Sequence, residues 1–508
     1  MTNQRNSAAE MTPQQFRDAG HQLVDQIAEF LSTIGERPVA PASTPREMRA
    51  KIGGDNAGLP EGGADPATLV RDAAELLFEN STFNGHPRFF GYITSSASPI
   101  GALADMLAAT INANCGAWSL SPIATEIELQ TIRWIAELIG YTQDCGGVLV
   151  SGGNMANMVC LIAAIRAKAG AAADVRAHGV SSAPRFAVYA SSEVHTWLEK
   201  GADICGIGTD AVRLIELDES RAMSVAALRR QIAEDRAKGW TPGVVVGTAG
   251  SVSTGVVDPL PELASLCAAE SMWFHIDGAY GAPAAILDDA PSALRAIHLA
   301  DSVAVDPHKW LYAPLEAGCA LVRDGEALTR AFSFHPPYYV FDGDAHDPPT
   351  NFHERSPQNS RGFRALKVWL TMRQVGRRGY VEMIGDDIAL ARELYELAKT
   401  NDDLEALTQA LSITTFRYVP ADLRERPGDT ETSDYLNRLN AALLAKLQDE
   451  GIVYLSNAVI DSVFALRACI VNFRTSRKDI ATLVEATLAG GRMLDAGMRS
   501  APVVSSES

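Results

Sequence analysis

The chain has 508 residues, of which 47% are hydrophobic and 21% are charged, as in an ordinary globular protein. This length exceeds what one compact core usually organises, so we expect at least two packed units. The 44 basic residues are outnumbered by 62 acidic residues, and the net charge of −18 disfavours nucleic acids and anionic membranes as partners. No uncharged apolar run reaches the roughly 18 residues that a membrane-spanning helix needs.

Cysteine usage favours a cytoplasmic location. The seven cysteines are scattered without a C-x-x-C pair, which is typical of reduced thiols rather than of a disulfide framework. Residues 1–10 are polar and lack the apolar stretch of a signal peptide. At the other end, residues 496–508 are rich in serine and are expected to form a disordered tail.

Residues 1–95 are expected to form an N-terminal helical arm. Thr12 followed by Gln15 has the spacing of a helix capping box, and a second helix is expected to begin at Pro66. Residues 38–63 between them carry several prolines and glycines and indicate a linker. Each helix has an apolar face that it cannot bury alone, which predicts packing on another subunit or domain.

Helices alternate with short apolar strands from about residue 120 onward. Such alternation predicts an α/β fold with a mostly parallel sheet covered by helices on both faces, here in a large domain over residues 96–375. Ligands of such sheets bind beyond the carboxyl ends of the strands, so the residues directly after each strand matter most. The expected strands are 147–150, 186–190, 212–217, 244–248, 273–277, 302–305 and 319–322.

A smaller C-terminal α/β domain is expected over residues 376–495. It follows a helix that begins after Arg361. Its strands are predicted at 413–418, 452–455 and 466–473, and its helices at 435–449 and 478–489.

A glycine-rich turn follows the first of the strands of the large domain. Gly152, Gly153 and Asn154 come directly after this strand and open a helix. Glycine lets backbone N–H groups approach an anion closely, and a helix N-terminus favours negative charge, so the turn suits a phosphate. It is neither a Walker loop nor a G-x-G-x-x-G fingerprint, and taken alone it is better explained as a plain tight turn.

An acidic residue ends the strand 273–277. Asp277 is followed at once by Gly278 and Ala279, small residues that leave room for a flat ring. A carboxylate in this place can pair with a protonated ring nitrogen, as the pyridinium of pyridoxal phosphate requires. A helix cap or a metal ligand is the alternative, and the lack of an accompanying His/Cys/Glu cluster disfavours a metal.

A lysine and a histidine follow two other strands. Lys309 lies just after strand 302–305, where lysine is rare unless it is paired or reactive, and desolvation would favour its nucleophilic neutral amine. A lysine that extends to solvent explains the segment equally well. His195 follows strand 186–190 and would be placed to stack on a planar cofactor, although a capping or core histidine is a fair alternative.

Taken together, these residues resemble the pyridoxal-phosphate-dependent group II decarboxylases, which include aromatic-L-amino-acid, glutamate and histidine decarboxylases. The resemblance runs from about His86 to Trp369, and the aromatic-amino-acid branch looks closer than the glutamate branch. The matching motifs are His86-Pro-Arg-Phe-Phe-Gly-Tyr92, Ser121-Pro-Ile-Ala-Thr-Glu126, Ser151-Gly-Gly-Asn154, His195, His275-Ile-Asp-Gly-Ala279, Asp306-Pro-His-Lys-Trp310 and Arg361-Gly-Phe-Arg-Ala-Leu-Lys367.

The resemblance implies an aminotransferase-like fold of type I, a homodimer with the site at its interface, and pyridoxal 5'-phosphate as cofactor. Lys309 would form a Schiff base with the cofactor, Asp277 would pair with its pyridine nitrogen, and His195 would stack on its ring and touch the substrate carboxylate. The phosphate would be held by the glycine turn, by His308 and by a donor from the dimer partner. The implied cofactor-binding residues are Gly152, Gly153, Asn154, His195, Thr248, Asp277, Ala279, Asp306, His308 and Lys309, with Asp306 in place of the asparagine of the animal aromatic enzymes.

The resemblance also implies the reaction. We expect decarboxylation of an L-amino acid, in the first place an aromatic one, to the amine and carbon dioxide through a quinonoid intermediate. Tyr338 would protonate that intermediate; Tyr339 is the near alternative, and both would otherwise be ordinary loop aromatics. The competing hypotheses are oxidative decarboxylation to an aldehyde, which plant relatives with phenylalanine at this tyrosine carry out, transamination, a non-aromatic substrate, and a binding protein without catalysis.

Overall fold

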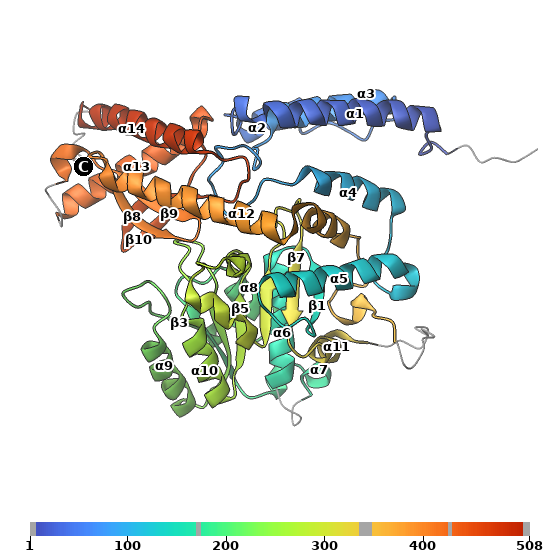
Figure 1. Ribbon diagram of the computed structural model, residues 1–508, viewed down its shortest axis with the longest axis vertical. Helices are drawn as coiled ribbons and strands as arrows, with labels where there is room; N and C mark the ends of the chain where they lie inside the picture. Colours follow the sequence, from blue (N-terminus) through green and yellow to red (C-terminus); the bar gives the residue numbers. More distant parts are fainter. Residues whose placement is uncertain (1–6, 169–173, 335–347, 425–428, 501–508) are drawn as a thin grey trace, which may run out of the picture.

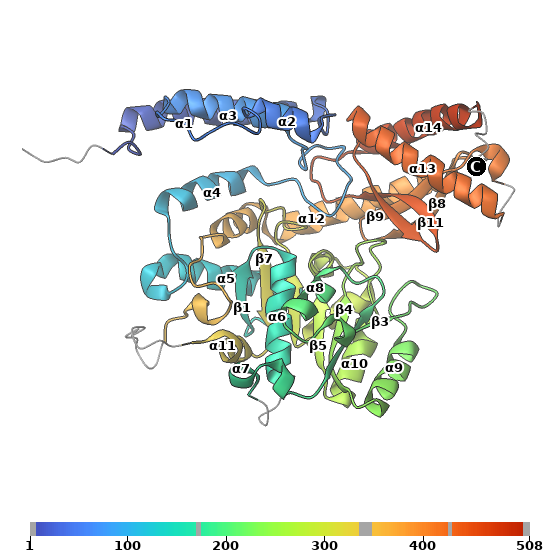
Figure 2. The same ribbon diagram turned by 180° about the vertical axis from the view of Figure 1, so that it is seen from behind.

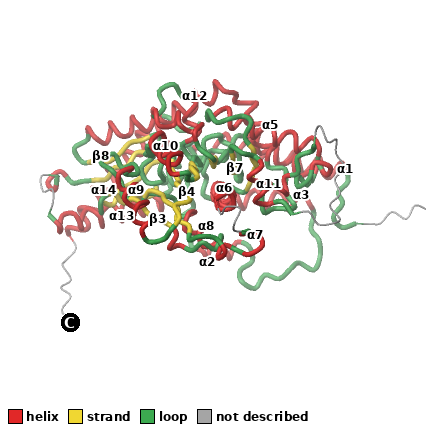
Figure 3. Tube along the Cα trace, turned by 90° about the horizontal axis from the view of Figure 1, so that it is seen from below, coloured by secondary structure: helices red, strands yellow, loops and turns green. Residues whose placement is uncertain are grey.

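The computed structural model describes residues 7–168, 174–334, 348–424 and 429–500. They form an N-terminal helical arm, a large α/β body and a smaller C-terminal α/β unit (Figure 1). Viewed from below, the long helices of the arm and those of the small unit lie toward opposite sides (Figure 3), but the two parts touch: the Val39 N–H donates to the Gly451 carbonyl at 2.8 Å. The expected disordered tail falls largely in residues 501–508, outside the described residues.

The arm begins with the predicted capping box. Helix α1 (Pro13–Thr33) starts after Thr12, whose side chain accepts from the Gln15 backbone, while the Gln15 side chain accepts from the Thr12 backbone at 2.9 Å. Helix α3 (Pro66–Asn80) begins at the predicted proline. The two helices lie side by side, with the rings of Phe30 and Phe78 stacked at 4.4 Å.

The predicted linker between these helices contains structure of its own. A 3-10 turn η1 (Ile34–Glu36) ends α1, and a short helix α2 (Pro45–Lys51) lies in the middle of the segment. Thr44 and Glu47 form a second capping box at its start. The box stabilises a two-turn helix within a proline- and glycine-rich stretch whose composition indicates only a linker.

The sheet of the large body is mostly parallel, as predicted. Its seven strands run in the order β1-β7-β6-β5-β4-β2-β3, and β7 alone is antiparallel to its neighbours β1 and β6. Strands β1 and β6 are therefore parallel to each other, and six carboxyl ends lie at one edge. The strands are β1 (Gly146–Val150), β2 (Phe186–Ser191), β3 (Val212–Ile215), β4 (Thr241–Thr248), β5 (Trp273–Asp277), β6 (Ser302–Val305) and β7 (Gly318–Val322).

Helices cover both faces of this sheet. Helices α6 and α8 lie on one face and α9 and α10 on the other (Figures 1 and 2). The helices and 3-10 turns of the body are α4 (Pro99–Ile111), η2 (Trp118–Leu120), α5 (Pro122–Leu138), α6 (Gly153–Lys168), α7 (Val175–His178), η3 (Val180–Ser182), α8 (Trp197–Ile204), η4 (Thr209–Ala211), α9 (Val225–Ala237), α10 (Leu260–Glu270), η5 (Ala282–Ile286), η6 (Ser292–Leu299), α11 (Glu326–Phe332) and η7 (Phe352–Glu354).

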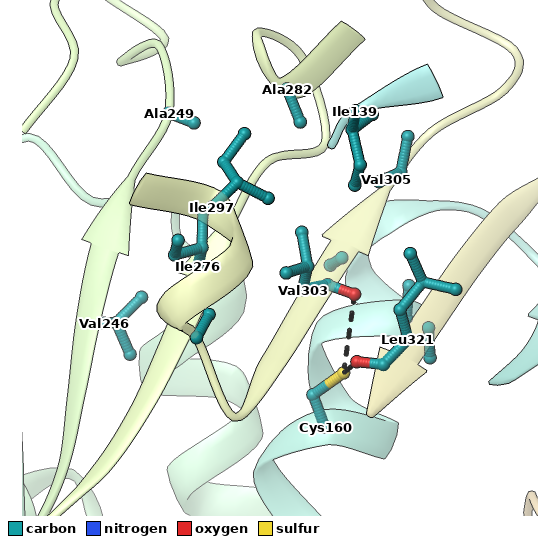
Figure 4. Close-up of a cluster of buried hydrophobic side chains, with 14 of the residues drawn as sticks. Ile139, Cys160, Val246, Ala249, Ile276, Ala282, Ile297, Val303, Val305 and Leu321 are labelled. Atoms are coloured by element: carbon teal, nitrogen blue, oxygen red, sulfur yellow. Dashed lines mark hydrogen bonds between the residues drawn. The ribbon is translucent and has the colours of Figure 1, made fainter. Parts of the chain in front are cut away.

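The core is built from the central strands. Val246, Ile276, Val303 and Leu321 lie on four neighbouring strands and are fully buried (Figure 4). Cys160 of α6 faces them, with its Sγ 4.0 Å from the Val303 carbonyl and 3.9 Å from the Leu321 carbonyl. Strands covered on both faces are expected to be apolar throughout, and this explains why short apolar runs were sufficient to locate them.

Helix α4 was not predicted from the sequence. It packs on α12 (Ala365–Thr400), yet Leu103, Met106, Leu107 and Ile111 remain exposed along its other side. Because it is apolar on both sides, it lacks the one-faced periodicity by which a surface helix is recognised. Neither α4 nor any other helix of the described residues is long and apolar enough to cross a bilayer.

Helix α12 leads from the large body into the small unit. It is broken at Gly376, which has φ 66° and ψ 169°, and its second half packs on a four-stranded antiparallel sheet of order β10-β11-β9-β8. Two further helices complete the unit. Its elements are β8 (Leu404–Ala410), β9 (Ile413–Tyr418), η8 (Ala421–Leu423), α13 (Thr430–Glu450), β10 (Ser456–Ile460), β11 (Val463–Cys469) and α14 (Arg477–Ser500).

One predicted strand of the small unit is wrong. Residues 452–455 are not a strand; Tyr454 forms an isolated bridge with Phe89, and its carbonyl accepts from the Phe90 N–H at 2.7 Å. The segment is apolar because Val453 and Leu455 are buried in the core of the small unit, and the strand begins only at Ser456. Strand β8 was missed, because its sequence Leu-Glu-Ala-Leu-Thr-Gln-Ala has few β-branched or aromatic residues.

Candidate active site

A cavity of about 350 Å³ lies at the edge where the carboxyl ends of the parallel strands meet. Gly152, just outside its lining, lies against the His308 ring: a Cβ at this glycine would be 3.2 Å from the His308 Cε1. Tyr338 and Tyr339 fall outside the described residues. Nine of the predicted residues line the cavity: Gly153, Asn154, His195, Thr248, Asp277, Ala279, Asp306, His308 and Lys309.

The glycine turn opens the start of α6 toward the cavity. Gly152 has φ +82°, a left-handed conformation that side chains rarely adopt. At Gly153 a Cβ would lie 2.5 Å from the Oδ2 of Asp306. Both positions therefore require glycine, one for its conformation and one for its close approach to a strand-end carboxylate.

The carboxylate of Asp277 is held by two N–H donors. Its Oδ2 accepts from the indole Nε1 of Trp197 at 2.7 Å, and its Oδ1 accepts from the Ala279 backbone at 3.2 Å. The Trp197 backbone N–H also donates to the Nδ1 of His195 at 3.2 Å. Partial burial lowers the pKa of His195, which favours the neutral ring. Nothing in the sequence indicates that Trp197 contacts both residues.

A second polar group lies beneath Asp277 on the same strand. His275 is buried, with its Nε2 2.7 Å from the Oδ1 of Asn157 and its Nδ1 2.8 Å from the Oγ of Ser302. Burial lowers the pKa of His275 to about 4, so the ring is neutral at neutral pH. Asn157 lines the cavity one helical turn after the glycine turn, and it too was not predicted.

Lys309 is paired with the acid that begins its motif. Its Nζ lies 3.3 Å from the Oδ2 of Asp306, and the Nε2 of His308 lies 3.7 Å from the same oxygen. The other oxygen, Oδ1 of Asp306, is buried and has no hydrogen-bond partner among the described residues. Burial raises the pKa of Asp306 and lowers that of His308, although their mutual attraction opposes both changes.

Thr248 ends strand β4 and is fixed through its backbone. Its N–H donates to the Oδ2 of Asp258 at 2.8 Å, while the Oδ1 of Asp258 accepts from the Met223 backbone at 2.8 Å. Burial raises the pKa of Asp258 to about 6, and the buried Thr248 hydroxyl is among the groups that oppose this rise.

The segment after Lys309 is tied to the small unit. The Trp310 indole and the Tyr312 hydroxyl both donate to the Oδ2 of Asp387 on α12, at 2.9 and 2.7 Å. Trp310 also stacks on Tyr280, which lines the cavity, with ring centroids 4.8 Å apart. The position of the lysine therefore depends on how the second half of α12 packs.

Arg467 of strand β11 is a buried cation that does not line the cavity itself but is close enough to affect Tyr280, which does. It is 3% exposed; its Nη1 donates to the Ser456 hydroxyl at 2.8 Å, and its Nε and Nη2 have no partners among the residues described. Burial raises the pKa of Tyr280, which lines the cavity, and the positive charge of Arg467 opposes this rise. Sequence reasoning missed Arg467, because an arginine within a predicted strand carries no sign of which cavity it approaches.

Comparison with known proteins identifies the family. The pyridoxal-dependent decarboxylase conserved domain matches residues 45–419, about three quarters of the chain. The chain belongs to the pyridoxal-dependent decarboxylases. An aromatic-L-amino-acid decarboxylase of Bacillus atrophaeus is 33% identical over 472 residues, covering 93% of this chain and 94% of that protein. A phenylacetaldehyde synthase of Petunia hybrida is 28% identical over 465 residues, covering 90% of each.

The fold of this pyridoxal-dependent decarboxylase is that of its relatives. The crystal structure of a tryptophan decarboxylase of Catharanthus roseus in complex with L-tryptophan superposes with a TM-score of 0.84 at 25% identity, covering 95% of this chain and 99% of that one. The expected aminotransferase-like fold of type I and the pyridoxal phosphate cofactor are thereby confirmed. The cavity suits this cofactor, since it offers an amine, an oriented carboxylate, a glycine-opened helix and the Oδ1 of Asp306, which is buried without a partner among the described residues.

Proposed function

We propose that this decarboxylase converts an aromatic L-amino acid to the corresponding amine and carbon dioxide, with Lys309 holding the cofactor. The observation that carries the proposal is the meeting of the Lys309 amine, the Asp277 carboxylate and the glycine-opened start of α6 in one cavity. The aromatic substrate class is supported by the named activities of the relatives.

Bound pyridoxal phosphate supplies an electron sink for the bond that breaks when the carboxylate leaves. Asp277 would hold the ring nitrogen, and the first turn of α6 would hold the phosphate by its N–H groups and its dipole. His195 and Ala279 would face the ring from the cavity walls, with the Thr248 hydroxyl beside it. The proposed cofactor-binding residues are Gly152, Gly153, Asn154, His195, Thr248, Asp277, Ala279, Asp306, His308 and Lys309.

A charged carboxylate at position 306 would repel a phosphate, because two anions repel each other. Burial raises the pKa of Asp306, which favours its protonated form. A protonated carboxyl donates one hydrogen bond, and its unpaired Oδ1 would serve a phosphate oxygen as an asparagine amide does. We infer that Asp306 is compatible with the phosphate when it carries a proton.

We propose Tyr338 as the group that returns a proton to the substrate carbon. The support is the resemblance to the aromatic branch, and Tyr339 is the adjacent alternative. When the tyrosine protonates this carbon, the product is the amine. When the carbon is not protonated, it can be oxidised and the product is an aldehyde. The phenylacetaldehyde synthase among the relatives makes the aldehyde the second product to be measured.

The proposed function is tested by incubating the holoenzyme with L-tryptophan, L-tyrosine, L-phenylalanine, L-dihydroxyphenylalanine, L-histidine and L-glutamate. Carbon dioxide, amine, aldehyde and oxygen uptake are measured together. We expect amine and carbon dioxide in equal amounts from an aromatic substrate, without oxygen uptake. Aldehyde with oxygen uptake would replace the proposed reaction, and turnover of only L-histidine or L-glutamate would replace the proposed substrate class.

We propose that Arg467, a residue of the small unit, binds the carboxylate of the substrate. The Arg467 guanidinium is 3% exposed, and two of its nitrogens have no hydrogen-bond partners among the described residues. Burying such a charge costs free energy unless an anion pairs with it. The third nitrogen, Nη1, donates to the Ser456 hydroxyl, which fixes the orientation of the guanidinium group. A carboxylate is the anion that every amino-acid substrate carries and that the amine product lacks.

Replacing Arg467 with methionine is expected to raise the KM for the substrate by about 10-fold or more, the usual worth of a buried hydrogen bond to a charged group. Inhibition by the product amine should be unchanged, since the amine has no carboxylate. Arg417→Met is the matched control, because Arg417 lies on the adjacent strand β9 and pairs with Glu405. Equal weakening of substrate and amine would show that Arg467 only supports the fold.

We propose that the protein is a homodimer that covers the apolar faces of the arm and of α4. Phe16, Leu69 and Leu77 of the arm are more than half exposed, as are Leu103 and Ile111 of α4. In Figures 1 and 2 the arm lies apart from the sheet of its own chain. Apolar faces of this extent are rare on monomers, and a second copy would bury them against the same surfaces.

Sedimentation of the holoenzyme is expected to give twice the mass of one chain. The double substitution Leu103→Glu and Leu107→Glu should shift the protein to monomers and lower activity per chain, because charges are poorly tolerated in a buried interface. Leu214→Glu is the control, since Leu214 is equally exposed on the remote strand β3. A monomeric wild-type protein with full activity would contradict the proposed dimer.

We also propose a cytoplasmic location. The support is the set of seven free cysteines, five of them buried, without a disulfide among the described residues. Cell fractionation with an antibody against the chain would test it.

A further inference from the structure

The residue that the proposed function leaves without a role is Trp197, the first residue of α8. Its side chain is 1% exposed, and it lines the cavity two residues after His195. A buried tryptophan usually finds a hydrogen-bond partner for its indole N–H, and the partner of Trp197 is a carboxylate at 2.7 Å. The acceptor is Asp277, the group proposed to hold the ring nitrogen of the cofactor.

The indole is held rigidly in this position. It meets the ring of His275 edge-on, with centroids 5.8 Å apart and an interplanar angle of 85°. His275 is itself fixed by Asn157 and Ser302 at its two ring nitrogens. The Trp197 backbone N–H is bonded to His195, so one residue touches both the carboxylate and the histidine proposed to face the ring.

Donors to a carboxylate stabilise its negative charge. In a pair between a carboxylate and a protonated ring nitrogen, stabilising the anion keeps the shared proton on the nitrogen. The Ala279 N–H makes one such bond at 3.2 Å, and the Trp197 indole makes the shorter one. The interaction between Asp277 and the cofactor ring therefore depends on the indole N–H of Trp197, which belongs neither to Asp277 nor to the cofactor.

We infer that Trp197 is a positioning residue that holds Asp277 as an oriented anion and so keeps the cofactor ring nitrogen protonated. The inference rests on the proposed role of Asp277. It assigns to Trp197 a function in cofactor binding and in ring protonation, beyond its packing in the core.

The test is Trp197→Phe, which keeps an aromatic ring against His275 and removes the donor. The dissociation constant for pyridoxal phosphate should rise by about 10- to 100-fold, the range for a lost hydrogen bond to a charged group. In holoenzyme prepared with cofactor labelled with ¹⁵N in the ring, the nitrogen signal should move toward that of the unprotonated ring. Benzothienylalanine in place of Trp197 is the second variant, because it replaces only the N–H by sulfur and keeps the size of the indole.

The matched control is Trp369→Phe. Trp369 also donates its indole N–H at 2.7 Å, but to the neutral Gln130 outside the cavity, so cofactor affinity and the ¹⁵N signal should stay unchanged. An unchanged dissociation constant and ring signal in both Trp197 variants would overturn the inference. Asp277→Asn separates the two levels: if it weakens the cofactor while the Trp197 variants do not, only the inference fails, and if it has no effect, the proposed role of Asp277 fails as well.

Discussion

Replacing Lys309 with alanine is expected to lower decarboxylation by about 10⁴-fold or more and to abolish the visible absorbance of the lysine-bound cofactor. The reason is that the Lys309 amine would hold the cofactor covalently in the cavity that Asp277 also lines, and no other lysine lines the described cavity. Folding should be little affected, because the side chain makes one ion pair, with Asp306. Activity and absorbance are measured on the same preparation.

Two variants show that the amine itself is required. Lys309→Arg keeps the positive charge beside Asp306 and removes the nucleophile, so it should be as inactive as the alanine variant. Lys200→Ala is the control, since Lys200 is an exposed lysine on α8 close enough to affect the pKa of His195. Carbon dioxide release by Lys309→Ala at a rate near that of the wild type would remove Lys309 from the proposed mechanism.

The residues that the sequence located well are those governed by a local rule. Asp277 ends one short apolar strand and Lys309 follows another, and in a parallel sheet the carboxyl ends of such strands meet at one edge. No knowledge of distant contacts was needed to place these two residues in one cavity. The capping box of Thr12 and Gln15 is predictable for the same reason, because all its atoms lie within four residues.

The residues that were missed depend on contacts between distant segments. Trp197 reaches Asp277 across 80 positions of the chain, and only the turn after β2 decides that its indole faces strand β5. Arg467 comes from the small unit, whose placement beside the cavity depends on the break at Gly376 in α12. The apolar segment 452–455 pairs with Phe89 and Phe90 rather than with a neighbouring strand, a choice that its own sequence does not contain.

A buried ion pair behind the glycine turn is expected to have the largest effect on stability. Arg361 and Glu128 are both fully buried, with the Arg361 Nη2 2.5 Å from the Glu128 Oε1. The pair also clamps strand β1: Glu128 accepts from the Leu149 N–H at 2.9 Å, and Arg361 donates to the Leu149 carbonyl at 2.6 Å. Leu149 lies three residues before Gly152, so the clamp fixes the strand that leads into the proposed phosphate turn.

Glu128→Leu is expected to lower the free energy of unfolding by about 3–5 kcal/mol, because it leaves the Arg361 charge buried without its partner. Thermal or denaturant unfolding of the apoenzyme measures the loss, and the affinity for pyridoxal phosphate should fall with it. Arg364→Met is the control. Arg364 pairs with Glu316 at 3.2 Å, but the glutamate side chain is 45% exposed, so the loss should stay below about 1 kcal/mol.

The double substitution Glu128→Leu with Arg361→Met separates charge from packing. The double variant no longer buries an unpaired Arg361 charge, so it should be more stable than Glu128→Leu alone. It should remain less stable than the wild type, because the carbonyls of Leu149 and Cys115 lose the donor that Arg361 provides. If the two losses simply add, the ion pair does not stabilise the fold as a pair, and the glycine turn is held by the backbone contacts of β1 alone.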